Sequence, residues 1–145
     1  MESKLYWLVN NQVLYWKLSG AISASAISEM SRFIITTIDR QNIPKVHLIL
    51  DATGVKSLKH ANREARSEFA LLAKQVWMGQ VVAIVHNVQI QIHLNAMSSA
   101  FGMKWKTVPS MKHANRSLQQ SDPMLRRMPE LRLDSIIINP IAELT

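Results

Sequence analysis

Asp51, His60 and His86 are the residues whose types and spacing could support acid–base or metal chemistry. Asp51 follows the apolar run HLIL, His60 lies a short loop later, and His86 follows the apolar run VVAIV. If both runs are parallel strands, their carboxyl ends meet at one edge of the sheet, where the sites of open α/β proteins lie. We therefore expect these three side chains to form a rim cluster with acid–base or metal-ligand potential.

A structural role competes with this chemistry at each position. A carboxylate at the end of a strand commonly accepts hydrogen bonds from the following turn, which would be Ala52–Gly54 in this chain. The chain has no cysteine, which excludes disulfides, thiolate metal sites and cysteine nucleophiles. With four glycines and no nucleophile elbow, it also lacks a phosphate-cradling loop. The sequence thus predicts no catalytic residue, no metal and no cofactor.

The length and composition are those of one folded domain. The chain has 145 residues, of which 48% are hydrophobic and 19% charged. No apolar run approaches the roughly 20 residues that cross a bilayer, and the start MESKLYWLV has no signal-peptide pattern. We expect a cytoplasmic protein without a membrane span.

The net charge of +7 is concentrated toward the C-terminus. Between Phe101 and Arg132 there are seven basic residues and two acidic ones. Such a face either keeps the protein solvated or attracts nucleic acid, anionic membrane or an acidic partner. The segment KWKTVPSMKHANR lacks the repeated aromatic platform of single-strand binders, so nucleic acid is not an expected partner.

The N-terminal half predicts a hairpin, a helix and a buried strand. The runs KLYWLV and QVLYWKL flank Asn10 and Asn11, which suit a two-residue hairpin turn. From Ser23 to Arg40, apolar residues recur at spacings of three and four, which predicts an amphipathic helix capped by Ser23 or Ser25. The strand KVHLIL then ends at Leu50, before Asp51 and a polar loop.

The second half continues the alternation of helices and strands. A helix over 61–76 precedes the strand VVAIV, and a short edge strand KWKTV precedes a last helix over 110–120. The segment between them, from Val88 to Phe101, fits either a strand or a helix. We choose a helix, because it continues a parallel crossover pattern.

The chain divides into a domain over 1–120 and a tail over 121–145. Pro123, Pro129 and Pro140 interrupt any helix in the tail, and Ser135–Asn139 is an apolar strand candidate. Such a tail docks on its own domain or pairs with the sheet edge of a neighbouring chain.

Four tryptophans and eight methionines allow two interpretations. They could line a pocket for a hydrophobic ligand, or they could pack in the core or an interface. Trp7 and Trp16 lie on the predicted hairpin, where cross-strand packing explains them, so core or interface is the favoured interpretation.

The order of elements, together with KLSGAIS and LILDATGV, resembles the STAS fold of anti-sigma-factor antagonists, the SpoIIAA-like group. The resemblance covers about residues 4 to 120. It implies an α/β fold with a ββαβαβα sheet and helices packed mainly on one face. In that family an Asp-Ser pair follows the strand–loop segment, and a partner kinase phosphorylates the serine. Lys59 and His60 occupy the corresponding positions, so the phospho-switch is absent, although Thr53 and Ser57 are nearby hydroxyls.

The resemblance implies a non-enzymatic protein-interaction module of bacterial signalling or regulation. Its partner would be a protein such as a kinase or regulator, and it would self-associate, as a homodimer, through the aromatic hairpin, the tail or both. The alternative is a small-molecule or lipid-binding sensor with a pocket between the sheet and the second and third helices. The expected partner-binding surface consists of Asp51, Thr53, Ser57, Lys59, His60 and Arg63.

Overall fold

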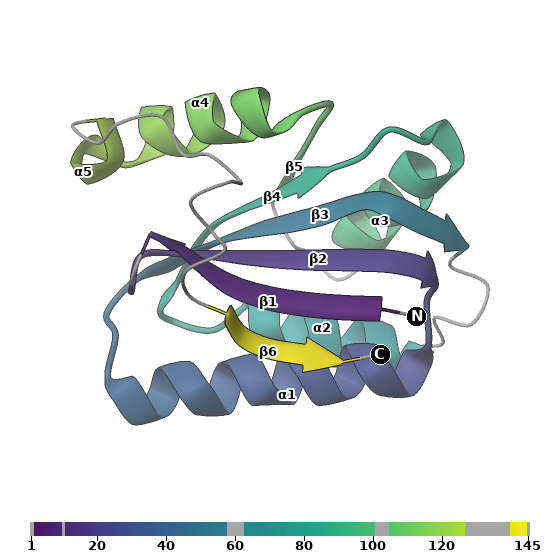
Figure 1. The fold of residues 1–145 in the computed structure, drawn as a ribbon, viewed down its shortest axis with the longest axis horizontal. Helices are drawn as coiled ribbons and strands as arrows, with labels where there is room; N and C mark the ends of the chain where they lie inside the picture. Colours follow the sequence, from purple (N-terminus) through teal and green to yellow (C-terminus); the bar gives the residue numbers. More distant parts are fainter. Residues whose placement is uncertain (1, 10, 58–62, 101–104, 127–139, 145) are drawn as a thin grey trace.

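The structure is a computed structural model of the 145-residue chain, and it describes residues 2–9, 11–57, 63–100, 105–126 and 140–144. Two strands open the chain, and helices and strands alternate after them (Figure 1). This succession confirms the predicted α/β class. In order the elements are β1 (Glu2–Val9), β2 (Val13–Ala21), α1 (Ala24–Gln41), β3 (Val46–Ser57), α2 (Arg63–Ala73), β4 (Met78–Ile84), α3 (Val88–Ala100), β5 (Trp105–Val108), α4 (Met111–Ser121), α5 (Pro123–Arg126) and β6 (Pro140–Leu144).

The strands form one mixed sheet of six strands in the order β5-β4-β3-β2-β1-β6. Strands β2 to β5 run parallel, whereas β1 is antiparallel to both β2 and β6. The predicted hairpin joins β1 to β2, and Asn11 in its turn has a φ of 60°, a conformation that asparagine tolerates better than most residues. As predicted, the segment before α4 forms an edge strand, β5.

Helix α1 begins and ends where its sequence predicts. The Ser23 hydroxyl caps it by accepting a hydrogen bond from the Ala26 N–H, and Asn42 follows the last turn at a φ of 52°. Its apolar stripe is buried at Met30, Ile34 and Ile38. Because one stripe faces the sheet, the helix gains most of its stability from tertiary packing.

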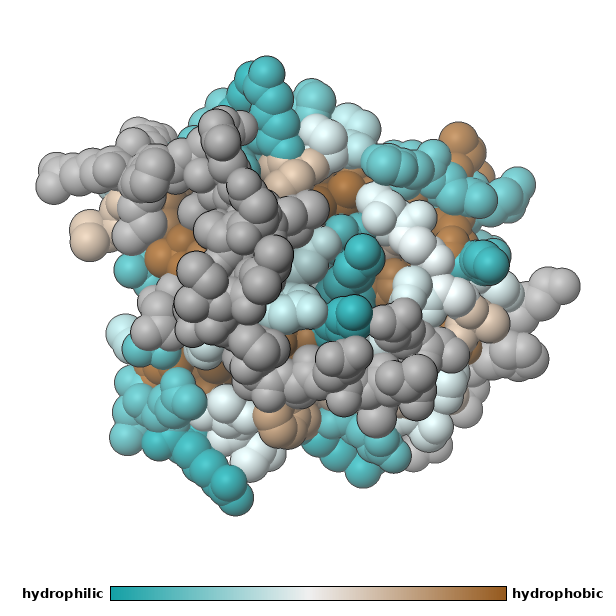
Figure 2. All heavy atoms as spheres, viewed as in Figure 1, coloured by the Kyte–Doolittle hydropathy of each residue, from teal (hydrophilic) through white to brown (hydrophobic). Residues whose placement is uncertain are grey.

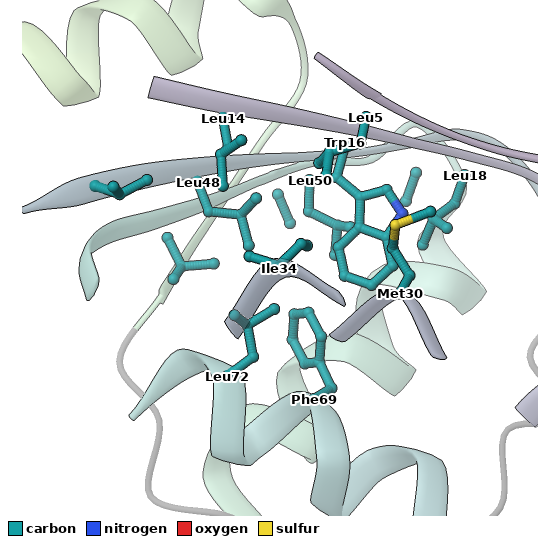
Figure 3. Close-up of a cluster of buried hydrophobic side chains, with 14 of the residues drawn as sticks. Leu5, Leu14, Trp16, Leu18, Met30, Ile34, Leu48, Leu50, Phe69 and Leu72 are labelled. Carbon is teal, nitrogen blue, oxygen red and sulfur yellow. The ribbon is translucent and has the colours of Figure 1, made fainter. Parts of the chain in front are cut away.

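The first face of the sheet is covered by α1, α2 and α3. Trp16 of β2 is fully buried at its centre, and its indole contacts Phe69 of α2 at a ring-centroid distance of 5.9 Å (Figure 3). Leu48 and Leu50 of β3 point to the same side as Trp16. Trp7 and Trp77 also belong to this cluster, and Trp105 packs against it. The interpretation of the tryptophans as core residues is therefore confirmed.

The second face of the sheet carries its own helices, so the expectation of helices mainly on one face is only partly correct. A separate apolar cluster joins Val13, Ile49 and Val82 of the sheet to Leu118 of α4 and Leu125 after it. Figure 1 shows α4 and α5 on the opposite side of the sheet from α1 and α2. Side chains alternate along each strand, so β2 and β3 supply both clusters.

Strand β3 is longer than the sequence predicts, and the expected strand end at Leu50 is wrong. It continues to Ser57, since its pairing with β2 extends from Val13↔His47 to Ala21↔Ser57 through two register shifts. Gly54 permits this close pairing, because a Cβ there would lie 2.9 Å from the Ser19 Cβ. Asp51 consequently lies within a strand and not on a loop.

The structure also describes the predicted helix that begins at Val88 and a strand at the C-terminus. Val88–Ala100 is helical, as chosen, and forms α3. At the C-terminus, β6 pairs antiparallel with β1 of the same chain, with Lys4 opposite Glu143. The strand candidate Ser135–Asn139 lies outside the described residues.

Candidate functional site

Asp51 is a buried carboxylate held by its neighbours. It is 5% exposed, and its Oδ2 accepts a hydrogen bond from the Tyr15 hydroxyl. Its Oδ1 accepts two more, from the Thr53 N–H at 3.0 Å and the Thr53 hydroxyl at 2.7 Å. A buried carboxylate requires such partners. Burial and the hydrogen bond to Asp51 raise the pKa of the Tyr15 phenol, which keeps it a proton donor to the carboxylate.

The structure does not bring the rim cluster together. His60 lies outside the described residues. His86 is exposed, and its Nε2 donates a hydrogen bond to the Pro109 carbonyl at 2.8 Å, which ties the end of β4 to the end of β5. Asp51 and His86 each bond to other groups and not to one another. The described part of the rim thus offers no acid–base pair.

The residues of the expected partner-binding surface differ in their exposure. Asp51 is buried, Thr53 and Ser57 are half-buried, and the Ser57 carbonyl accepts a hydrogen bond from the Ile22 N–H at 2.9 Å. Lys59 and His60 lie outside the described residues, and Arg63 is the first residue of α2, with its side chain not described. Within the described chain, Thr53 and Ser57 remain as accessible members of this surface.

A polar pocket opens on the second face of the sheet, and we call it the Lys4–Lys17 pocket. Its volume is about 330 Å³, and its lining consists of Lys4, Lys17, Ser19, Thr53 and Gly54. Figure 2 shows hydrophilic (teal) side chains in the middle of the view, over the position of β1 and β2 in Figure 1. The pocket thus lies on the opposite side of the sheet from the one expected for a sensor pocket, where Trp16, Phe69 and Leu72 fill the space.

The register of three strands places two lysines of the pocket side by side and an acidic residue next to them. Lys4 of β1 is directly opposite Lys17 of β2, and Lys17 is the neighbour of Asp51 on β3. Like charges placed directly opposite each other on a sheet destabilise the pairing unless a counter-charge is present. Our sequence interpretation missed the two lysines, although a two-residue turn at Asn10–Asn11 already places Lys4 opposite Lys17.

A second polar pair, formed by the buried His47 and the half-buried Asp122, lies at the other end of β3. His47 is 2% exposed; its Nδ1 accepts a hydrogen bond from the Gln80 N–H at 2.9 Å, and its Nε2 donates one to Asp122 at 2.8 Å. The neighbouring Gly79 has no room for a side chain, since a Cβ would lie 2.6 Å from the His47 Nδ1. Both ring nitrogens are in use, so His47 joins β3 to the α4–α5 corner and has no nitrogen left to act as a base.

The exposed His113 also has a structural partner. The His113 Nδ1 lies 2.7 Å from the Ser110 hydroxyl, which caps α4 by accepting from the His113 N–H. Between Glu2 and Leu144, the residues that the structure describes contain no group of three or more His, Asp or Glu side chains arranged to hold a metal ion.

Sequence comparisons add no assignment: no family model matches this chain, and no curated protein matches its sequence. None of the described helices is both long and apolar enough to cross a membrane.

Proposed function

We propose that this chain is a non-enzymatic, STAS-like interaction module of bacterial signalling or regulation, without a phospho-switch. The observation that carries the proposal is the sheet order. An antiparallel β1 lies beside four parallel strands in the order β2-β3-β4-β5, and each crossover between parallel strands contains a helix. The succession of these elements is the ββαβαβα order that the resemblance implies for residues 4 to 120.

The hydrogen bonding of the titratable groups supports a binding role over catalysis. Asp51 has both carboxylate oxygens engaged, and His47 has both ring nitrogens engaged. A general base needs a free site within reach of a substrate proton. These groups therefore position strands and helices, and the accessible rim around Thr53 and Ser57 is left for recognition of a protein partner.

If two copies of the chain associate through the β1–β2 hairpin, they have to use the polar side of the hairpin. Trp7 and Trp16 are buried within the chain, and the outer edge of β1 is paired with β6. Removing residues 140–145, which contain β6, would expose that edge for pairing with a second copy. Light scattering of the full chain and of the truncated chain measures this directly, and we expect a larger mass for the truncated chain.

Site-specific photocrosslinking in the native cell tests the partner proposal. We expect a photoreactive residue at position 57 to capture one regulatory protein, such as a kinase, whereas the same residue at exposed Lys74 captures none. Capture of the same proteins from both positions would contradict a partner-binding surface around Thr53 and Ser57. Intact-mass analysis of the same material is expected to show no phosphate, and modification of Thr53 or Ser57 would contradict the absence of a phospho-switch.

A further inference from the structure

We propose that the Lys4–Lys17 pocket binds a small organic phosphate monoester, with the phosphate between the two lysines. Both lysines line the pocket, and they come from directly opposite positions on β1 and β2. This proposal does not rest on the proposed function, although Thr53 belongs both to the pocket and to the protein-partner surface.

Lys17 is the main cationic contact. It is exposed and lines the pocket, whereas Lys4 also makes an interaction within the chain and is in register with Glu143. The neighbouring Asp51 does not line the pocket, because its carboxylate is buried and bonded to Tyr15 and Thr53. Its charge therefore does not occupy the space of an anionic ligand.

The remaining lining groups divide into a donor and an acceptor. The half-buried Ser19 hydroxyl can donate a hydrogen bond to a phosphate oxygen. The Thr53 hydroxyl already donates its proton to Asp51, so only its lone pairs remain for a ligand. A ligand that fits both has a phosphate beside a hydroxyl group, as in a phosphorylated polyol or sugar.

The size of the pocket favours an organic phosphate over the free ion. Its volume of about 330 Å³ is at the lower end of the range for small-molecule sites, roughly 300–1,000 Å³. Gly54 lines the pocket next to Ser19, where a Cβ would lie 2.9 Å from the Ser19 Cβ and force that side chain to move. An inorganic phosphate ion has the same charge chemistry, but it is too small to fill the pocket.

Binding measurements on the full chain test this assignment. The probes are glycerol 3-phosphate, inorganic phosphate and glycerol, each added at 150 mM salt and followed by amide chemical shifts. We expect glycerol 3-phosphate to shift amides of β1, β2 and the Thr53 region, inorganic phosphate to bind at least threefold more weakly, and glycerol not to bind. Equal binding of both phosphates would overturn the organic part of the assignment, and absence of binding by both would overturn all of it.

Matched variants separate a site from general attraction to a basic protein. Lys17→Met is expected to weaken glycerol 3-phosphate binding at least tenfold and Ser19→Ala about threefold. Lys74→Met removes the same charge from an exposed position on α2's side of the molecule and is expected to change binding less than twofold. Similar losses for Lys17→Met and Lys74→Met would contradict the site. Thermal melts confirm that each variant is folded.

Discussion

The two faces of the sheet use the same strands in different ways. On the face toward α1 and α2, β2 contributes Leu14, Trp16 and Leu18, and all three are buried. On the face toward α4, the same strand contributes Val13 and Tyr15 to an apolar cluster and then Lys17 to an open pocket. Along β2 the first face is apolar from Leu14 to Leu18, whereas the second changes from apolar to charged after Tyr15.

This difference between the two faces indicates which part of the sheet is accessible to a ligand. Helices α4 and α5 cover the apolar part of the second face, and the charged part remains accessible. The Tyr15–Asp51 hydrogen bond lies at the boundary between the two parts. The first face therefore carries most of the stability, and the second combines a smaller core with a recognition surface.

The largest expected effect is on the first face. Trp16→Ala removes a fully buried indole and the hydrogen bond from its Nε1 to the Ser3 hydroxyl at 2.7 Å. We expect a loss of about 3–5 kcal/mol in the free energy of unfolding, measured by urea denaturation. Val76→Ala, at a position that is 98% exposed, serves as the control and should stay within about 0.5 kcal/mol. A loss below about 1 kcal/mol for Trp16→Ala would contradict the assignment of the main core to this face.

The second-largest expected effect concerns the Tyr15–Asp51 hydrogen bond on the second face of the sheet. Tyr15→Phe leaves the buried Asp51 carboxylate without its hydroxyl donor, and we expect a loss of about 2 kcal/mol. Tyr6→Phe removes a hydroxyl from the half-buried neighbour on β1, whose ring centroid is 6.4 Å from that of Tyr15. If both variants lose the same free energy, the Tyr15–Asp51 bond has no special role at the boundary.

The third effect concerns the helix that covers the apolar part of the second face. Ser110→Ala removes the N-cap of α4, and we expect a loss of about 1 kcal/mol in thermal or urea unfolding. Ser99→Ala, at an exposed position within α3, is the matched control with no cap to lose. An equal, negligible change in both would mean that α4 does not depend on its cap.

The smallest effect is a pH dependence at the His47–Asp122 pair. The hydrogen bond from His47 lowers the pKa of the Asp122 carboxyl below its ordinary value. The ionised carboxylate therefore contributes stability above the unfolded-state pKa, and this contribution is lost as the pH falls through the lower folded-state value. Asp122 is near the surface, so solvent screening keeps the effect below that of Ser110→Ala. Denaturation from pH 6 to pH 2 should show a smaller decline for Asp122→Asn, and an unchanged profile would contradict this role.

Local patterns predicted much of the fold. The β1–β2 hairpin, the stripe from Met30 to Ile38 and the cap at Ser23 each depend on neighbouring residues, and the structure reproduces them. The turn itself is longer than predicted, because the register pairs Val9 with Val13 and not with Gln12. The candidate site was less accessible to prediction. Asp51 was predicted to accept hydrogen bonds from Ala52–Gly54, and Thr53 of this segment does donate to it. Its other donor, Tyr15, lies on another strand and was not predicted.

The sequence by itself determined which residues alternate along each strand and which form a helical stripe, because these periods follow from backbone geometry alone. Only the tertiary structure decided that β3 continues to Ser57, because pairing with β2 satisfies backbone groups that would otherwise form a loop. It also decided that α4 and α5 cover one half of the second face and leave Lys17 and Thr53 accessible. Which helix covers which strand depends on contacts between residues far apart in the chain, and no local period encodes them.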